Sequence, residues 1–186
     1  AELDAADPLA AHRGLFVETP DLVAYLDGNS LGRPLAAIAQ SWQSFTEQQW
    51  AGRLIRGWSE GWMDLPEQVG DELAAAALGA APGTTIIADS TTVNFYKAMR
   101  AALNLRPGRR KVVLDRHNFP TNRYVAESLA RDLGLDLVWL DPPIEGGVTA
   151  DDVAAVVDDQ TAVVTLSQIA YQSAYLADVP AITRIA

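Results

Sequence analysis

A run of short polar residues, Asp89 to Asn94, has the sequence Asp-Ser-Thr-Thr-Val-Asn and stands between an apolar run and an expected helix. Backbone N–H groups in the first turn of a helix lack partners within the helix, and the helix dipole favours an anion there. The hydroxyl groups of Thr91 and Thr92 add further donors. The run is therefore a candidate cradle for a phosphate group, while plain N-capping by Asp89 or Ser90 is the alternative interpretation.

A second polar run, His117–Asn122, has the sequence His-Asn-Phe-Pro-Thr-Asn and follows an expected strand. In an open α/β sheet, ligands gather at the carboxyl ends of the strands, and both runs stand at such ends. The ring of Phe119 is suited to lie flat on a ligand ring, with Pro120 beginning the next helix. A buried phenylalanine that packs helix against strand is the alternative. A third polar pair, Ser167-Gln168, follows another expected strand.

Other kinds of site find little support. The chain has no cysteine, which removes disulfides, thiolate zinc sites and a cysteine nucleophile. The two histidines, His12 and His117, are far apart, and no carboxylates stand beside them at metal-ligand spacing. No glycine-rich phosphate loop of the nucleotide-binding kind occurs.

The elements that position these runs alternate along the chain. After an irregular arm over residues 1–34, we expect one helix from Pro34 to about Gly52 and another over Leu65–Leu78, ended by Gly79. Further on, short apolar runs alternate with helical segments, which indicates βαβ units and a parallel sheet covered on both faces. The expected strands are 84–88, 111–114, 135–140 and 162–166, and the expected helices are 92–103, 120–133, 150–157 and 179 onward.

The alternation predicts the α/β class and two parts. Residues 1–66 form an N-terminal arm with helices, and residues 67–186 begin an α/β domain. The last residues predict a helix without a capping residue, and four strands suggest an unfinished sheet. We therefore expect the chain to be part of a longer protein.

The composition limits the classes of function. Of the 186 residues, 49% are hydrophobic and 20% are charged, as in soluble globular proteins with a buried core. A formal net charge of −10 argues against nucleic-acid binding, which needs a basic surface. No apolar run approaches the roughly 18 residues of a membrane span. The acidic beginning of the chain does not resemble a secretory signal, and the lack of cysteine suits a cytoplasmic location.

Taken together, these motifs resemble those of the kynureninase family, nearly from end to end. The segment Tyr25–Gly32, which finishes with Gly-Asn-Ser-Leu-Gly, is similar to the family's opening motif. The segments Ile55–Trp58 and Trp62–Pro66 resemble the block that follows. The runs Thr91–Asn94 and Asn118–Thr121 match the cofactor-binding loops of the family in order and spacing.

The resemblance implies a fold-type I enzyme that depends on pyridoxal 5′-phosphate (PLP), with its active site at a homodimer interface. The implied reaction hydrolyses L-kynurenine (or 3-hydroxykynurenine) to anthranilate (or 3-hydroxyanthranilate) and L-alanine, in tryptophan degradation. Thr91 and Thr92 would hold the cofactor phosphate, and Phe119 would stack on the pyridine ring. Further cofactor contacts would come from Pro120, Thr121, Asn122 and Ser167. The substrate would lie near Ser30 and Trp58.

Two departures from the family stand out. At position 122 the family usually has Asp, whereas this chain has Asn122, which changes a charge near the cofactor. PLP catalysis of this kind also needs a lysine that bonds the cofactor. The two lysines here are Lys97, within a helix, and Lys111, at the end of a strand opposite the ligand edge. The family's lysine comes well after position 186, so we predict that these 186 residues alone are inactive.

Two other hypotheses remain open. One is a different fold-type I PLP enzyme, aminotransferase-like or cysteine desulfurase-like, against which the Gly-Asn-Ser-Leu-Gly opening and the tryptophan-rich block argue. The other is a non-catalytic α/β fragment or interaction domain, which the missing lysine favours.

Overall fold

The computed structural model describes residue 3 and residues 6–186, and the chain divides into two compact units, residues 1–87 and residues 88–186. The predicted boundary after residue 66 lies inside the first of these units. None of the helices in the described part of the chain combines the length and the apolar character that a bilayer crossing requires.

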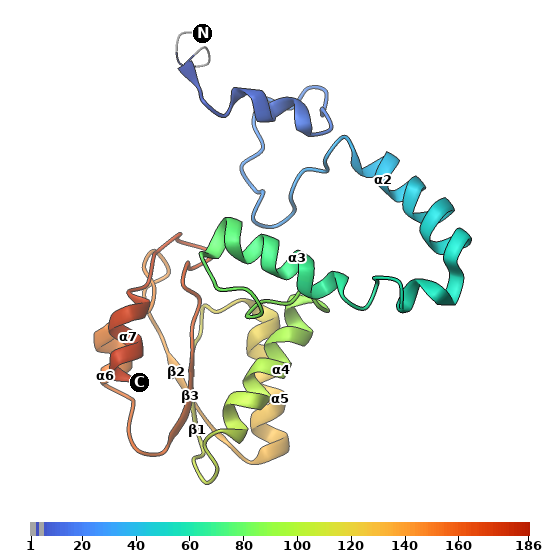
Figure 1. Ribbon diagram of the computed structural model, residues 1–186. Helices are drawn as coiled ribbons and strands as arrows, with labels where there is room; N and C mark the ends of the chain where they lie inside the picture. The colour runs from blue at the N-terminus through green and yellow to red at the C-terminus, as the bar shows by residue number, and fades with distance from the viewer. Residues whose placement is uncertain (1–2, 4–5) are drawn as a thin grey trace. The chain divides into compact units, whose positions relative to one another are not determined.

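The N-terminal unit consists of short helices joined by turns (Figure 1). Its elements are a 3-10 helix over Ala10–Leu15, α2 (Ile38–Ser44) continued by a π-helical segment over Phe45–Ala51, a second 3-10 helix over Leu54–Trp58, and α3 (Leu65–Leu73) continued by a π-helical segment over Ala74–Leu78. The helix predicted from Pro34 thus begins only at Ile38. The end predicted at Gly79 is confirmed, because this glycine caps the helix with a left-handed φ of +61°.

The first predicted strand, residues 84–88, is wrong. These residues belong to no strand, since the sheet in the described part of the chain has three strands and this segment is not among them. A strand is stabilised by a ladder of hydrogen bonds to a neighbouring strand. The amide of Ile87 instead donates to the carbonyl of Pro66 in α3, 3.0 Å away. An apolar, β-branched run therefore did not by itself predict pairing into the sheet.

The second unit contains a parallel sheet in the order β2-β1-β3 (Figure 1). The central strand is β1 (Lys111–Asp115), which pairs with β2 (Asp136–Leu140) on one side and with β3 (Thr161–Thr165) on the other. The first residue of β1 lies opposite the first residue of each neighbour. The predicted α/β class with a parallel sheet is confirmed, with these three strands close to their predicted bounds.

Helices cover both faces of this sheet. On one face lie α4 (Thr91–Asn104) and α5 (Pro120–Leu133), and on the other lie α6 (Ala150–Ala154) and α7 (Val179–Ile185) (Figure 1). The bounds of α5 are those predicted, because a proline begins it and a glycine with left-handed φ follows its last residue. By contrast, α6 ends three residues before the predicted 157.

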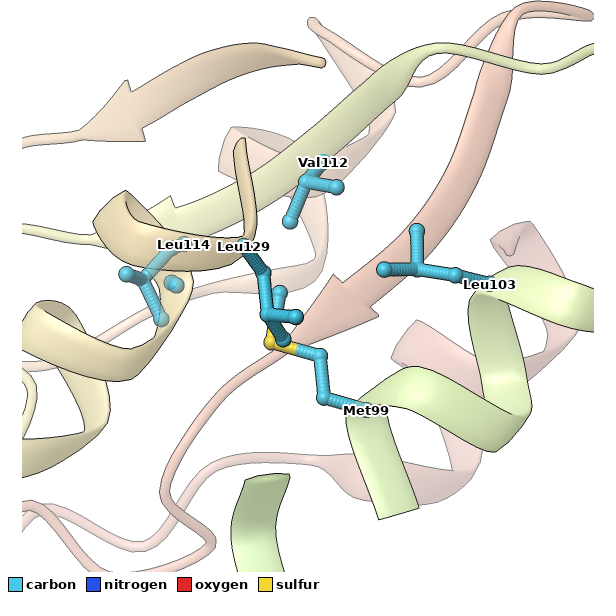
Figure 2. Packing of buried hydrophobic residues seen from close by; sticks show 6 residues of the cluster. Met99, Leu103, Val112, Leu114 and Leu129 are labelled. Atoms are coloured by element: carbon cyan, nitrogen blue, oxygen red, sulfur yellow. The ribbon is translucent and has the colours of Figure 1, made fainter. Parts of the chain in front are cut away.

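The larger cluster of buried side chains lies between β1 and the helices α4 and α5. Met99 and Leu103 of α4 and Leu129 of α5 meet Val112 and Leu114 of β1 (Figure 2). Successive side chains of a strand point to opposite faces of the sheet. Both β1 residues of this cluster therefore face the same pair of helices.

The residue between them, Val113, faces the other side. It packs with Val153 of α6 and Ile182 of α7. Residues 112–114 of β1 are fully buried, as expected for the central strand of a sheet with helices on both faces. Packing on both faces thus fixes the carboxyl end of β1. The candidate site lies at this end of the strand.

Candidate functional site

The carboxyl ends of the three strands form one edge of the sheet, called the rim below. Residues 116–119 follow β1, residues 141–149 follow β2, and residues 166–178 follow β3. The connection from β1 leads through α5 to β2, whereas β3 lies on the other side of β1. The order of the strands thus reverses between β1 and β3, and ligands of open α/β sheets bind outside the strand ends at such a point.

The first predicted cradle stands at the beginning of α4. Ser90 is the N-cap of this helix, and its Oγ accepts a hydrogen bond from the amide of Val93 at 3.3 Å. The capping interpretation is therefore correct for Ser90. The Ser90 side chain accepts from Val93 and not from the amides of Thr91 and Thr92. These two amides stand at the positive end of a helix of 14 residues. Capping and anion binding are thus compatible at this helix.

Both lysines of the chain have carboxylate partners. Lys97 of α4 forms an ion pair with Asp89, whose φ of +47° lets the chain turn sharply before the helix. Lys111 stands at the amino end of β1, away from the rim, and pairs with Asp158 while donating to the carbonyl of Val156 at 3.0 Å. The side-chain hydrogen bond from Lys111 is the main cause that lowers the pKa of Asp158 below its ordinary value.

Phe119 lies at the rim, directly before α5. Its side chain is 50% exposed, so it does not pack between helix and strand as the alternative interpretation requires. The ring packs in a T-shaped arrangement with the Tyr171 ring, with centroids 5.5 Å apart and planes at 75°. About half of the Phe119 surface stays accessible to a ligand. Pro120, Thr121 and Asn122 form the first turn of α5 behind it.

Tyr171 belongs to the loop after β3, and no sequence motif marked it. The loop folds back on itself, because Ile169 and Leu176 pair as an antiparallel bridge. It also contacts the loop after β2, where the Oγ of Ser173 donates to the carbonyl of Gly146 at 2.5 Å. The bridge and the hydrogen bond therefore fix the loop that places the Tyr171 ring against Phe119.

We predict that Tyr171 orients the Phe119 ring. An edge-to-face pair contributes about 0.5–1.5 kcal/mol beyond area burial, so Tyr171→Ala is expected to release the ring. The proton resonances of Phe119 would then lose the ring-current shift that Tyr171 causes. Tyr171→Phe keeps the ring and is the matched control. Unchanged Phe119 resonances in the alanine variant would contradict the prediction.

Ser167 lies beside the end of β1. It lines a small cavity at the rim with Asp115, His117 and parts of the loops after β2 and β3. The cavity holds about 20 Å³, which is room for roughly one water molecule. The Nε2 of His117 lies 3.7 Å from a carboxylate oxygen of Asp141. The structure thus joins the second and third predicted polar runs at one place.

A larger hollow of about 330 Å³ lies between α4, α5 and β3. Its lining is mostly apolar and includes Phe95 and Met99 of α4 and Leu166 after β3. The polar exception at its α5 side is Asn122, whose Oδ1 is buried and has no hydrogen-bond partner. A buried oxygen without a partner is costly, and no polar group of the described residues pairs with this one.

These parts suit one kind of ligand. A helix beginning with two threonines suits an anionic arm, and the Phe119 ring suits a flat aromatic face. Both belong to the second unit. In the described part of the chain, no group of three His, Asp or Glu side chains is arranged to hold a metal ion.

The other two predicted residues belong to the N-terminal unit. Ser30 stands in an exposed turn, where its amide donates to the carbonyl of Asp27 at 3.1 Å. The segment Gly28–Gly32 has the letters Gly-x-Ser-x-Gly, but it lacks the preceding strand and following helix of a hydrolase nucleophile. Trp58 is 55% exposed and meets the Trp62 ring edge-on, with centroids 5.7 Å apart. Their place near a substrate stays a prediction.

Known proteins resemble this chain over most of its length. The family model described as Aminotransferase class-V matches residues 32–186. The kynureninase of Pseudomonas fluorescens is 40% identical over an alignment of 191 positions, which covers 98% of this chain and 44% of that protein. The kynureninase of Burkholderia pseudomallei (strain 1106a) is 39% identical over 190 residues, and that of Burkholderia mallei (strain SAVP1) is 38% identical over 190 residues. The chain spans less than half the length of these curated relatives.

Proposed function

Because the chain belongs to the aminotransferase class-V family, we propose that it is the cofactor-binding part of a PLP-dependent kynureninase. The observation that carries this proposal is the similarity to kynureninases at 40% identity over 98% of the chain. The motifs that resemble the kynureninase family lie within this similarity, from the Gly-Asn-Ser-Leu-Gly turn to the Asn-Phe-Pro-Thr run. The proposed reaction is hydrolysis of L-kynurenine or its 3-hydroxy form to the anthranilate and L-alanine.

The donor set of the second unit fits PLP. Thr91 and Thr92 would hold the phosphate with their hydroxyls and with the amides that Ser90 leaves uncapped. Phe119 would stack on the pyridine ring, with Pro120 and Thr121 behind it. Asn122 would complete this cofactor loop, and Ser167 would complete the pocket at the end of β3. When bound, PLP supplies an electron sink for the bonds broken at the substrate.

The residues of this chain would bind and orient the cofactor. They would not supply the lysine that bonds it covalently. Lys97 and Lys111 are both engaged by carboxylates, and Lys111 lies at the wrong end of β1. The lysine that bonds the cofactor would therefore come from residues beyond these 186. The substrate contacts of Ser30 and Trp58, a homodimer and a cytoplasmic location are further parts of the proposal.

The complete protein, incubated with PLP and reduced with borohydride, is expected to gain the mass of one cofactor on a lysine after Ala186. With L-kynurenine it is expected to release anthranilate, which is followed by its fluorescence, and L-alanine in equal amount. Amino transfer to a 2-oxo acid, or sulfur release from cysteine, without anthranilate would instead identify another PLP enzyme of this family.

The role of Phe119 has a test of its own. We expect Phe119→Ala to weaken PLP about tenfold, because about 1.4 kcal/mol of ring stacking is lost. Phe119→Tyr keeps the aromatic face and is the control. PLP affinity is measured by quenching of tryptophan fluorescence in the apo protein. Equal affinity of the alanine variant and the wild type would remove Phe119 from the cofactor site.

A further inference from the structure

One glycine lies against an aromatic ring in the N-terminal unit. Gly57 is buried near the end of the second 3-10 helix, and a Cβ at this position would lie 2.5 to 2.7 Å from three atoms of the Trp62 indole. The indole therefore lies directly on the backbone of Gly57. Two hydrogen bonds hold this turn together, because the carbonyl of Gly57 accepts from the amides of Glu60 at 3.3 Å and of Trp62 at 3.0 Å. The missing side chain at position 57 thus gives the Trp62 ring its place.

The Trp62 ring in turn contacts the ring of Trp58. The two rings meet edge-on, with centroids 5.7 Å apart and planes at 78°. On Trp62 there is a further contact from Phe45, whose ring centroid lies 5.8 Å away. Trp62 is partly buried, whereas Trp58 is 55% exposed. Among the described residues, Trp62 is the aromatic ring that contacts Trp58, so a movement of the Trp62 ring would release Trp58.

Both rings line an open, apolar hollow of about 480 Å³, which we call the tryptophan pocket. Its lining residues are Phe45, Trp50, Leu54, Ile55, Trp58 and Trp62. Small-molecule sites measure about 300–1,000 Å³, so the volume suits a small ligand. Leu54 has a left-handed φ of +51°, which is uncommon for a residue with a large side chain and recurs at binding sites. The Trp58 ring thus lies beside a space that suits the flat, apolar part of a small molecule.

We propose that Gly57 is a positioning residue for the substrate contact of Trp58. Because position 57 carries no side chain, Trp62 lies on its backbone and holds the Trp58 ring beside the tryptophan pocket. This inference rests on the proposed function, in which Trp58 lies near the substrate. A ring that only holds the substrate contributes equally to the ground state and the transition state. Its displacement therefore raises KM and leaves kcat unchanged.

Circular dichroism of the complete apo protein tests the placement of the rings. Two tryptophan rings in contact give an exciton couplet in the far ultraviolet, and Trp58 with Trp62 is such a pair. Gly57→Ala is expected to remove the same part of the couplet that Trp62→Ala removes. Gly52→Ala is the matched control, because a Cβ there would lie 3.5 Å from the nearest atom, and it should keep the couplet. A full couplet in Gly57→Ala would overturn the proposal.

Steady-state kinetics with L-kynurenine test the consequence for the substrate. We expect Gly57→Ala to raise KM about fivefold, the size of a lost edge-to-face contact, with kcat within about twofold of the wild type. Gly52→Ala should change neither. In a Trp62→Ala background the ring that the methyl group displaces is absent, so Gly57→Ala should raise KM no further. A fivefold rise in both backgrounds would show that the methyl group acts without Trp62, against the proposal.

A second series keeps Gly57 and varies the ring, which covers the case that Gly57→Ala does not fold. Trp62→Phe retains an aromatic edge, so its KM is expected to lie about twofold above that of the wild type and below that of Trp62→Ala. Cooperative thermal unfolding shows that each variant is folded. Equal KM values for the wild type, Trp62→Phe and Trp62→Ala would exclude Trp62 as the ring that places Trp58, and the role of Gly57 with it.

The two readouts separate this inference from the proposed function. If kynurenine is turned over and Gly57→Ala loses the couplet at an unchanged KM, the proposed function stands and the positioning role falls. If the complete protein does not turn over kynurenine, the proposed function and the substrate role of Gly57 fall together. The couplet then still decides whether Gly57 places the two rings.

Discussion

Replacing Gly70 with alanine is expected to destabilise the N-terminal unit by about 3 kcal/mol, because the new methyl group has no room. A Cβ at this position would lie 2.3 Å from the carbonyl oxygen of Thr85 and 2.8 Å from its carbonyl carbon. Both are backbone atoms, so no side chain can turn away to relieve the clash. Helix α3 and residues 84–87 would have to separate.

Gly52→Ala is the matched control for this prediction. Gly52 has helical φ, and the nearest atom to a Cβ there is the carbonyl oxygen of Glu47 at an ordinary 3.5 Å. The substitution is expected to stabilise the unit by about 0.5 kcal/mol, because alanine restricts the unfolded chain. Urea unfolding of the complete protein, followed by tryptophan fluorescence, compares the two. Similar midpoints for both variants would show that α3 and residues 84–87 are not packed as described.

Leu114→Ala is expected to cost the second unit about 3–4 kcal/mol. Leu114 is fully buried as the fourth of the five residues of β1, and it belongs to the cluster with α4 and α5 (Figure 2). Helices from both sides support this strand, so the surroundings cannot collapse into the cavity that alanine would leave. Leu105→Ala is the control, because Leu105 is 71% exposed and its loss should cost less than about 0.5 kcal/mol. Urea unfolding followed by far-ultraviolet circular dichroism measures both, and equal losses would contradict the predicted core.

The local signals in the sequence predicted most of the second unit. Proline at the beginning of α5 and glycine behind it act within one or two residues, so the bounds of this helix were predictable. The strand predicted over 84–88 failed for a different reason. Its apolar, β-branched residues favour extended backbone, but a strand also requires a neighbour, and local sequence carries no information about that partner.

In the candidate site, too, local sequence predicted some residues, whereas others depend on contacts between distant parts of the chain. Phe119 and Asn122 stand in a recognisable run beside a strand end, and the structure places them at the rim and the hollow. Tyr171 had no such signal, because its importance comes from a contact between loops that are distant in sequence.

The order of the strands has a consequence for how the second unit folds. Lys111 and its β2 partner Asp136 are 25 positions apart, whereas Lys111 and its β3 partner Thr161 are 50 apart. Doubling a loop raises the entropic cost of closing it by about 0.6 kcal/mol, and contacts that are close in sequence form early. We therefore expect β1, α5 and β2 to form the folding nucleus, with β3 joining later. The edge between β1 and β3, near which we propose that the cofactor binds, would then be the last part of the sheet to form.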